Sequence, residues 1–193
     1  MVILSEVGEA SSSSSSPTYD HKYDVFLSFR GIDTRLNFTN HLHKALVDAN
    51  LATFLDDEEI QTGEFLKPEL ENAIKASRAS VIVLSQNYAS STWCLEELVL
   101  ILEQKRDSNQ IVIPVFYHVE PADVRKQQGS FGEAMAKHKV NMEVKTNLEE
   151  KNRLGKKMEI WKNALKQVSN LKGKDAKGRV EYVLSKGSTR VVT

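Results

Sequence analysis

Apolar residues occur along this chain in short runs that predict strands and in spaced sets that predict helices. Residues 23–29 alternate in character and predict a first strand, and residues 52–55 predict a short second one. Residues 79–84 and 111–117 are almost continuously apolar. Such runs are typical of parallel strands that are covered on both faces, so the pattern itself predicts four strands.

Helices are predicted between these strands, where apolar residues recur every three or four positions. The spacing favours helices over residues 38–49, from Pro68 onward, over about 95–105, from Phe131 onward, and over about 154–171. The intervening polar segments are expected to be loops, at residues 30–35, 56–64 and 118–129.

Strands that alternate with helices imply an α/β fold, a doubly wound parallel sheet with helices on both faces. Ligands of such sheets bind at the carboxyl ends of the strands. The segments at these ends are the loop 30–35, the acidic loop that runs to Gly63, and the helix start at Trp93. Three polar segments that are distant in sequence are therefore expected on one rim of the sheet.

The two ends of the chain differ from its middle in composition. Residues 11–16 are all serine, and residues 1–22 are expected to form a disordered leader. Residues 174–193 are basic and poor in large apolar side chains, and they are expected to be a tail or a linker. The remaining 23–173 have the size of one domain, which can bury a core without metal or disulfide.

Charge and cysteine content narrow the function classes. The 193 residues include 26 basic and 26 acidic ones, which gives a formal net charge of +0, so nucleic acid is not an expected partner. The single cysteine, Cys94, cannot form an intrachain disulfide and is expected in the core. With no secretory signal and no apolar run near the roughly 20 residues of a membrane span, we expect a cytoplasmic chain, with the nucleus as a second compartment.

The segment Trp93-Cys94-Leu95-Glu96-Glu97-Leu98 is the leading candidate for chemistry. Trp93 and Glu97 are four positions apart, so a helix would set a ring and a carboxylate together on one face. That pair could hold a cationic heteroaromatic leaving group. It could equally be a core tryptophan beside an acid that favours the positive end of the helix dipole.

Other kinds of site have little support in the sequence. No Gly-x-Gly-x-x-Gly follows the first strand, which argues against an ordinary dinucleotide-binding fold. A receiver-type phosphoacceptor would need an aspartate after the third strand, where the chain has Leu84 and Ser85. The histidines show no metal-ligand spacing with Cys94 or the carboxylates, so no metal site is expected.

Four longer motifs follow one another in order. They are YDVFLSFRGIDTR at 23–35, SQNYA at 85–89, WCLEEL at 93–98 and PVFYHVEPADVR at 114–125. Together they resemble plant Toll/interleukin-1 receptor (TIR) domains of the disease-resistance type, over residues 23–173. The resemblance implies a flavodoxin-like three-layer fold with a five-stranded parallel sheet, in a TIR-only protein or an isolated TIR fragment of an immune receptor.

The same resemblance implies an NAD⁺ hydrolase of plant immune signalling, which cleaves the nicotinamide–ribose bond and makes ADP-ribose-type signals that lead to defence and cell death. Glu97 falls on the family's catalytic glutamate and Glu96 on a variable position. NAD⁺ is then the substrate, and no cofactor is expected. The positions implied to bind NAD⁺ are Arg30, Gly31, Ile32, Asp33, Thr34, Arg35, Gly63 and Trp93.

The chemistry of these residue types agrees with that implication. Glycosidic bonds normally require two carboxylates, one of which protonates the leaving group. Nicotinamide leaves NAD⁺ as a neutral molecule, so a single carboxylate could suffice. Arg30 and Arg35 can pair with a pyrophosphate. Two alternatives stay open: Asp33 or Thr34 could cap the next helix, and Gly63 could be only a turn residue.

The resemblance also implies self-association through TIR–TIR contacts, with other TIR proteins or immune receptors as partners and no membrane. The family often carries Ser-His in its first helix, where this chain has Asn40 and His41. Asn40 can still form hydrogen bonds but is bulkier than serine. Two other functions remain possible, a non-catalytic TIR–TIR adaptor and nucleic acid binding by the basic tail.

Overall fold

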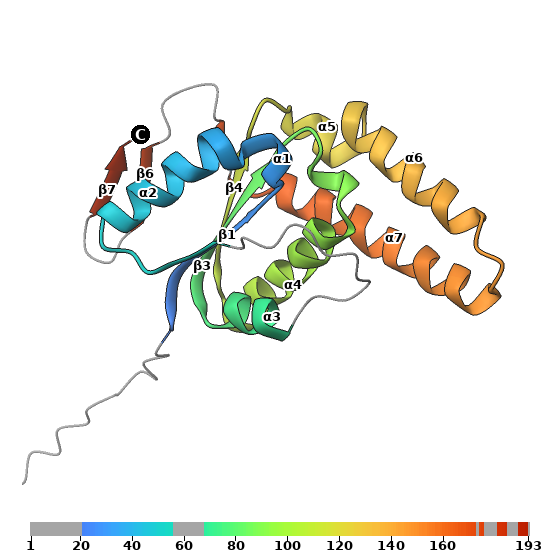
Figure 1. The fold of residues 1–193 in the computed structure, drawn as a ribbon, viewed down its shortest axis with the longest axis horizontal. Coiled ribbons are helices and arrows are strands. Elements are labelled where there is room, and N and C mark those ends of the chain that lie inside the picture. Colours follow the sequence, from blue (N-terminus) through green and yellow to red (C-terminus); the bar gives the residue numbers. More distant parts are fainter. Residues whose placement is uncertain (1–20, 56–67, 173, 176–180, 185–188, 193) are drawn as a thin grey trace, which may run out of the picture.

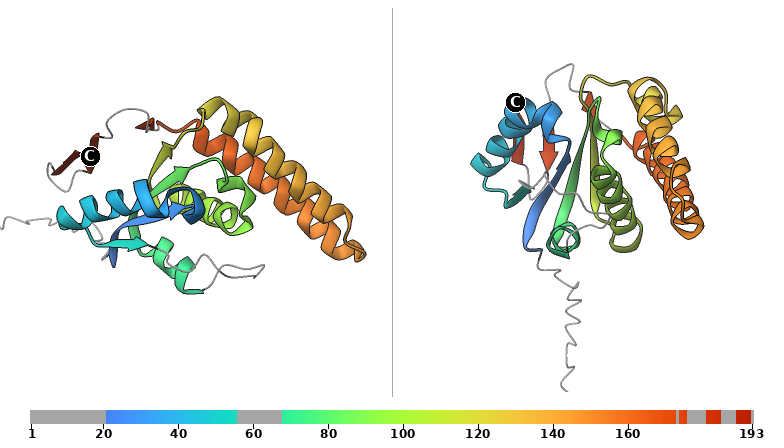
Figure 2. Two further views of the ribbon diagram at one scale, coloured as in Figure 1. Left: turned by 45° about the horizontal axis from the view of Figure 1, so that its top comes forward. Right: turned by 45° about the vertical axis from the view of Figure 1, so that its right-hand side comes forward.

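The computed structural model of the protein describes residues 21–55, 68–172, 174–175, 181–184 and 189–192 (Figure 1). The predicted leader up to residue 20 and the acidic loop with Gly63 lie outside the described residues. The described residues form a parallel sheet between two layers of helices (Figure 2). This arrangement confirms the predicted flavodoxin-like α/β fold.

Five parallel strands form the sheet in the order β2-β1-β3-β4-β5. Phe29 pairs in register with Val83, and Leu84 with Phe116, so β1, β3 and β4 end at one edge. The apolar pattern predicted four of the strands to within two residues, whereas β5 is too short to show a pattern. Their bounds are β1 Tyr23–Phe29, β2 Thr53–Leu55, β3 Ser77–Leu84, β4 Ile111–Phe116 and β5 Lys174–Asp175.

Helix α2 covers one face of the sheet, and α3 and α4 cover the other (Figure 2). Helices α6 and α7 form an antiparallel pair outside α4, with α7 packed on α4 and α5. No described helix is long and apolar enough to cross a membrane. The helix bounds are α2 Asn40–Asp48, α3 Pro68–Lys75, α4 Thr92–Ser108, α5 Pro121–Lys126, α6 Gly129–Glu143 and α7 Leu148–Ser169.

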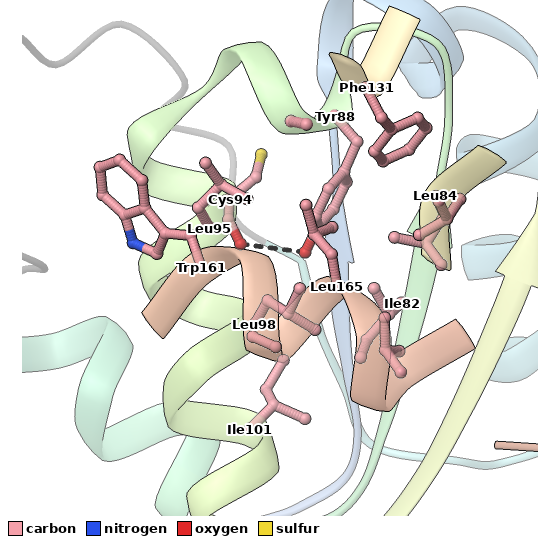
Figure 3. Packing of buried hydrophobic residues seen from close by; sticks show 14 of the residues in the cluster. Ile82, Leu84, Tyr88, Cys94, Leu95, Leu98, Ile101, Phe131, Trp161 and Leu165 are labelled. Atoms are coloured by element: carbon pink, nitrogen blue, oxygen red, sulfur yellow. Dashed lines mark hydrogen bonds between the residues drawn. The ribbon is translucent and has the colours of Figure 1, made fainter. Parts of the chain in front are cut away.

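Side chains of β1 alternate between two buried clusters. Val25 and Leu27 face α2 and pack with Leu42. Phe26 faces the other way, into the larger cluster formed with α3, α4 and α7, part of which is drawn in Figure 3. Burying each apolar side chain of this size contributes about 1.5–3 kcal/mol, so β1 is held firmly from both faces. Because Ser28 shares the face of Phe26, its hydroxyl points toward α4.

The segment 30–35, expected as a loop, is helical instead. Gly31–Thr34 forms α1, and Arg35–Thr39 forms a π-helical segment, η1, that continues into α2. The backbone N–H groups of Asp33 and Thr34 donate to the carbonyl of Arg30, at 3.0 and 3.2 Å. The residues of the segment 30–35 are mostly polar and show no helical spacing of apolar positions, so the hydrophobic pattern did not predict this helical turn.

Further boundaries differ from the sequence prediction. Helix α7 begins at Leu148 rather than near 154, because Asn147 caps it by accepting the N–H groups of Glu149 and Glu150. The expected loop 118–129 contains α5, which begins at Pro121, a favourable residue for a first helical turn. Helix α4 begins at Thr92 rather than near 95, because Ser91 caps it by accepting the Cys94 N–H at 3.3 Å.

The predicted tail contains short strands. Besides β5, it holds an antiparallel hairpin of β6 (Glu181–Leu184) and β7 (Thr189–Val192). The sheet thus extends just beyond residue 173, while the predicted boundaries of leader, domain and tail stay predictions.

Candidate active site at the carboxyl ends of β1 and β3

The strand order reverses between β1 and β3. Strand β2 lies on one side of β1, and all later strands of this sheet lie on the other. A crevice forms outside the carboxyl ends of the strands at such a point, and ligands bind there. Three segments meet at this edge: α1 after β1, the 3₁₀ turn η2 (Tyr88–Ser90) after β3, and the first turns of α4. We call this edge the rim.

Asp33 fastens the segment after β1 to the segment after β3. Its carboxylate accepts hydrogen bonds from Ser85 Oγ at 2.5 Å, and from the backbone N–H and side-chain amide of Asn87, both at 2.8 Å. None of the helices α1, η1 and α2 has a side-chain cap. The alternative in which Asp33 caps the next helix is therefore wrong; the residue fixes the shape of the rim.

Thr34 is also structural but is not a cap. Its buried hydroxyl donates to the Arg30 carbonyl at 3.3 Å and accepts from Thr39 Oγ1 at 2.7 Å. These bonds tie α1 to η1, so Thr34 stabilises the turn.

Two cations flank the end of β1. The Arg35 guanidinium lies over the Phe29 ring, 5.2 Å from its centroid. Arg30 follows β1 directly and is half-buried, and its Nε is buried without a hydrogen-bond partner within the described residues. Between them, Gly31 is buried and Ile32 is 75% exposed. The predicted NAD-binding residues of this segment thus have different environments.

Glu97 is the only buried carboxylate among the described residues, at 3% exposure. Its Oε2 accepts a hydrogen bond from Ser28 Oγ at 2.6 Å. Burying a carboxylate is costly unless it is hydrogen-bonded, and Ser28 supplies one such bond. Glu97 lies in the second turn of α4, beyond the first turn in which the helix dipole acts, so the dipole explanation is not supported.

The neighbouring Glu96 points to the opposite side of α4. Its Oε1 lies 2.8 Å from Lys157 Nζ on α7, and both side chains are about one quarter exposed, at 23% and 24%. The two adjacent glutamates are therefore distinguished by geometry as well as by the motif, because only Glu97 reaches the sheet.

A buried tyrosine supports the Glu97 contact. The Tyr88 hydroxyl lies 2.8 Å from Ser28 Oγ and donates to the Cys94 carbonyl at 3.0 Å, a bond drawn in Figure 3. Burial, followed by the proximity of Cys94 and Glu97, raises the pKa of Tyr88 well above its ordinary value of 10.0. Tyr88 is thus a neutral hydroxyl at physiological pH, and it links β1, η2 and α4.

The start of α4 is held against the end of β1. Cys94 is in the core, as predicted, and its Sγ lies 3.5 Å from the Phe29 carbonyl. The preceding Trp93 is half-buried and packs on the larger cluster, one helical turn before Glu97 and on the same side. Its Nε1 is buried and, within the described residues, has no hydrogen-bond partner. Unpaired buried donors are rare in folded proteins, which sets the N–H groups of Trp93 and Arg30 apart from the other polar groups of this edge.

Comparison with known proteins decides the family. Residues 22–182 match the family model described as the TIR domain. This chain belongs to the TIR domain family. It is 50% identical over 166 residues to the disease resistance protein RPV1 of Vitis rotundifolia, which covers 85% of the chain and 11% of that protein. The TMV resistance protein N of Nicotiana glutinosa is 46% identical over 164 residues, covering 85% and 13%.

A solved structure agrees with this assignment. The TIR domains of the activated Roq1 resistosome, which directly recognizes the pathogen effector XopQ, match at a TM-score of 0.68 and 46% identity. The match covers 81% of this chain and 89% of that one. The chain spans only a small part of its curated plant relatives, at 11–13% of their length.

The predicted self-association residues of this TIR domain lie in a different helix from Glu97. Asn40 and His41 begin α2, and both side chains are exposed. Helix α2 covers the opposite face of the sheet from α4 (Figure 2). Gly63 lies outside the described residues. No group of three or more His, Cys, Asp or Glu side chains in the described part of the TIR domain could hold a metal ion.

Sequence reasoning assigned no role to Ser28, Ser85, Asn87 or Tyr88, although all four belong to the motifs. Ser28 gave the only signal that could have been used. It occupies a polar position on the same strand face as Phe26, which points into the larger cluster, and a buried hydroxyl there needs a partner. The identity of that partner depends on tertiary packing.

Proposed function

We propose that this TIR domain hydrolyses NAD⁺ at the rim, with Glu97 as its catalytic residue. The observation that carries the proposal is the buried Glu97 carboxylate, bonded to Ser28 at the carboxyl end of β1. Arg30 and Arg35 follow the same strand end. A carboxylate and two cations thus gather where sheets of this order bind ligands.

The proposed reaction needs only one carboxylate. The bond between ribose C1′ and the nicotinamide nitrogen breaks, and its electron pair goes to that nitrogen, so nicotinamide leaves as a neutral molecule. The ribose becomes an oxocarbenium ion, whose positive charge the Glu97 carboxylate stabilises. Water adds to C1′ and releases a proton, which gives nicotinamide, ADP-ribose and H⁺.

The other rim residues have proposed roles in holding the substrate. The guanidinium groups of Arg30 and Arg35 pair with the pyrophosphate. Trp93 lines the nicotinamide end and donates its indole N–H. Asp33 and Thr34 act indirectly by fixing the rim.

Three proposed NAD-binding positions act through the backbone or an apolar surface. Gly31 and Gly63 permit close approach of the chain to the substrate, and Ile32 offers an exposed apolar side chain. NAD⁺ is the substrate in this proposal, and no cofactor is needed.

We place the reaction in plant immune signalling. Support comes from relatives named as disease resistance proteins and from the TIR domains of the Roq1 resistosome. We expect self-association through TIR–TIR contacts, with other copies or with immune receptors, and we expect the start of α2 with Asn40 and His41 to contribute. The products would act as ADP-ribose-type signals for defence and cell death, in the cytoplasm, with the nucleus as a second compartment.

The decisive experiment compares two adjacent glutamates. NAD⁺ is incubated with wild type, Glu97→Gln and Glu96→Gln over a series of protein concentrations, and released nicotinamide is quantified. Loss of Glu97 should lower the rate by about 100-fold or more, whereas Glu96→Gln should match wild type because its carboxylate faces α7. The concentration series is needed because activity that depends on self-association rises steeply with protein. Equal release by wild type and Glu97→Gln at every concentration would refute the proposal.

A second candidate function is a non-catalytic TIR–TIR adaptor. It is favoured by the exposure of Asn40 and His41, which leaves the first turn of α2 open to another protein. In an assay of defence signalling, an adaptor would keep its activity in Glu97→Gln and lose it in His41→Ala. An NAD⁺ hydrolase that acts on self-association would lose its signalling activity in both variants.

A further inference from the structure

A separate cavity lies behind α4, on the side away from Glu97. Its volume is about 380 Å³, within the range of about 300–1,000 Å³ that is usual for small-molecule sites. It is lined by the start of α4 and by the α6–α7 pair. Thr92 and Glu96 of α4 line the cavity. Each directly precedes a residue of the Trp93–Glu97 pair, so the two sites use neighbouring residues of the same two helical turns.

The floor of the cavity is apolar and adaptable. Trp161 and Met158 on α7 are 2% and 5% exposed. A Cβ added at Gly155 would lie 3.5 Å from Met142 Sδ, so α6 and α7 approach closely there and leave a thioether at the floor. Thioethers adjust to many shapes and make favourable contacts with aromatic rings. This floor suits a flat apolar body.

The edge of the cavity is cationic. Lys145, Arg153 and Lys157 line it together with the carboxylate of Glu96, and the carboxylate of Glu150 lies beside Lys145. Lys157 pairs with Glu96 at 2.8 Å, and Lys145 pairs with Glu150 at 2.9 Å. The Lys145–Glu150 pair is the more exposed of the two, at 40% and 27% of its side chains, so an incoming anion can compete with Glu150 for Lys145.

Exposed apolar side chains extend the cavity at the tip of the helix pair. Val144, which lines the cavity, is 71% exposed, and Val140 one turn earlier is 57% exposed. Leu148, at the start of α7, is 70% exposed. Apolar residues that gather beside a pocket commonly mark a place where a ligand is covered.

Direct contacts join the cavity to the segments that hold the rim. His138 lines the cavity, with its Nε2 2.9 Å from the Ala89 carbonyl and its ring 5.3 Å from the Trp161 ring. Ala89 follows Tyr88 in η2. An occupant would therefore touch residues that support both η2 and α4.

We infer that this cavity is a second small-molecule site, which takes an organic anion with a flat aromatic body. The aromatic body lies on Trp161 and the methionines, and the anionic group points toward Lys145 and Arg153. None of the lining residues is among those proposed to bind or cleave NAD⁺. The site thus goes beyond the proposed NAD⁺ hydrolysis and stands or falls independently of it.

The test uses 8-anilinonaphthalene-1-sulfonate, an aromatic anion whose fluorescence rises in apolar surroundings. Titration of the full chain should saturate at one probe per chain. The double variant Lys145→Glu/Arg153→Glu should lower the affinity by about tenfold or more, because two attractions become repulsions. The matched control Lys156→Glu/Lys166→Glu, which changes two exposed lysines of α7 outside the cavity, should bind as wild type does.

Three further measurements keep the inference open to refutation. Leu154→Trp, which fills the cavity from a half-buried position, should also weaken binding. The uncharged analogue N-phenyl-1-naphthylamine should bind about tenfold more weakly than the sulfonate. Glu97→Gln should bind the sulfonate as wild type does, whatever the nicotinamide assay gives.

The opposite results would overturn the inference. Equal affinity of the cavity variant and its lysine control would exclude this cavity, and weaker binding by Glu97→Gln would move the probe to the rim. Binding without saturation, or only in samples whose circular dichroism shows lost structure, would mean that the probe reports unfolded chain.

Discussion

The two sides of α4 are built in opposite ways. Toward β1, Glu97 is 3% exposed and accepts a hydrogen bond from Ser28 at 2.6 Å. The two residues belong to a buried network that includes Tyr88. Toward α7, Glu96 is 23% exposed at its side chain and pairs with Lys157 at the edge of an open cavity of about 380 Å³. Removing one partner of a buried hydrogen bond costs the full desolvation of the other, whereas water reaches the partly exposed Glu96–Lys157 pair and can replace a lost partner. Similar substitutions should therefore have large effects toward β1 and small effects toward α7.

The largest effect is expected for Ser28→Ala. Without the hydroxyl, the Glu97 carboxylate loses a bond that fixes its position, and kcat for nicotinamide release should fall by about 100-fold with a smaller change in KM. The control is Ser80→Ala, which removes another buried serine bond, at 3.2 Å to Gln110, on the adjacent strand β3. Ser80→Ala should lower stability and leave kcat unchanged, and Ser28→Thr should recover part of the rate. If both alanine variants keep kcat, the geometry of Glu97 does not depend on Ser28.

The next effect concerns stability of the rim. Asp33→Ala removes three hydrogen bonds that join α1 to the segment after β3, and the free energy of unfolding should fall by about 2–3 kcal/mol. Urea unfolding measures the change. The control is Asp48→Ala, at an exposed position of α2, whose free energy of unfolding should stay within about 0.5 kcal/mol of wild type. A loss as small as that of the control would mean that the rim is held by packing alone.

Tyr88→Phe should have a smaller effect that depends on pH. It removes the hydroxyl that contacts Ser28 and the Cys94 carbonyl, and we expect a loss of about 1–2 kcal/mol near neutral pH. The folded-state pKa of Tyr88 is raised far above 10.0, so its neutral form stabilises the fold below the unfolded pKa, and this contribution declines as pH rises above about 10.

The difference between wild type and Tyr88→Phe should therefore shrink above about pH 10, in unfolding measured across that range. Leu84→Ala, which truncates a buried side chain of β3 that carries no titrating group, serves as the control, and its loss of stability should not shrink in the same way. A constant difference at all pH values would contradict the proposed neutral hydroxyl network.

The smallest effect is expected toward α7. Lys157→Met removes the ion pair with Glu96 while keeping an unbranched apolar chain, and stability should change by less than about 1 kcal/mol. Nicotinamide release should also stay near the wild-type rate. A loss as large as that of Asp33→Ala would show that the two sides of α4 are not as different as their burial indicates.

Local pattern was enough to predict most of the fold. Parallel strands buried on both faces are continuously apolar, so 79–84 and 111–117 were recognisable without tertiary information. The turn at Gly31–Thr34 was missed because its residues are mostly polar and its stabilising bonds involve backbone groups. Strand β5 was missed because two residues show no period.

The candidate site was predicted only in part. The spacing of Trp93 and Glu97 along one helix side is a local property, and the structure shows it. Ser28, a hydrogen-bond partner of Glu97, lies 69 positions away in the sequence, and its contact with Tyr88 spans 60 positions. Such pairings arise from packing and leave no trace in a local pattern. The cavity behind α4 depends in the same way on how α6 and α7 meet at Gly155.

The chain has two tryptophans, and α4 separates their surroundings. Trp93 lies in its first turn at the rim, and Trp161 lies in the cavity behind it. The variants Trp93→Phe and Trp161→Phe would each leave a single emitting indole. Indole fluorescence would then come from one side of the helix alone. The molecule thus carries its own optical reporter in each of its two candidate sites.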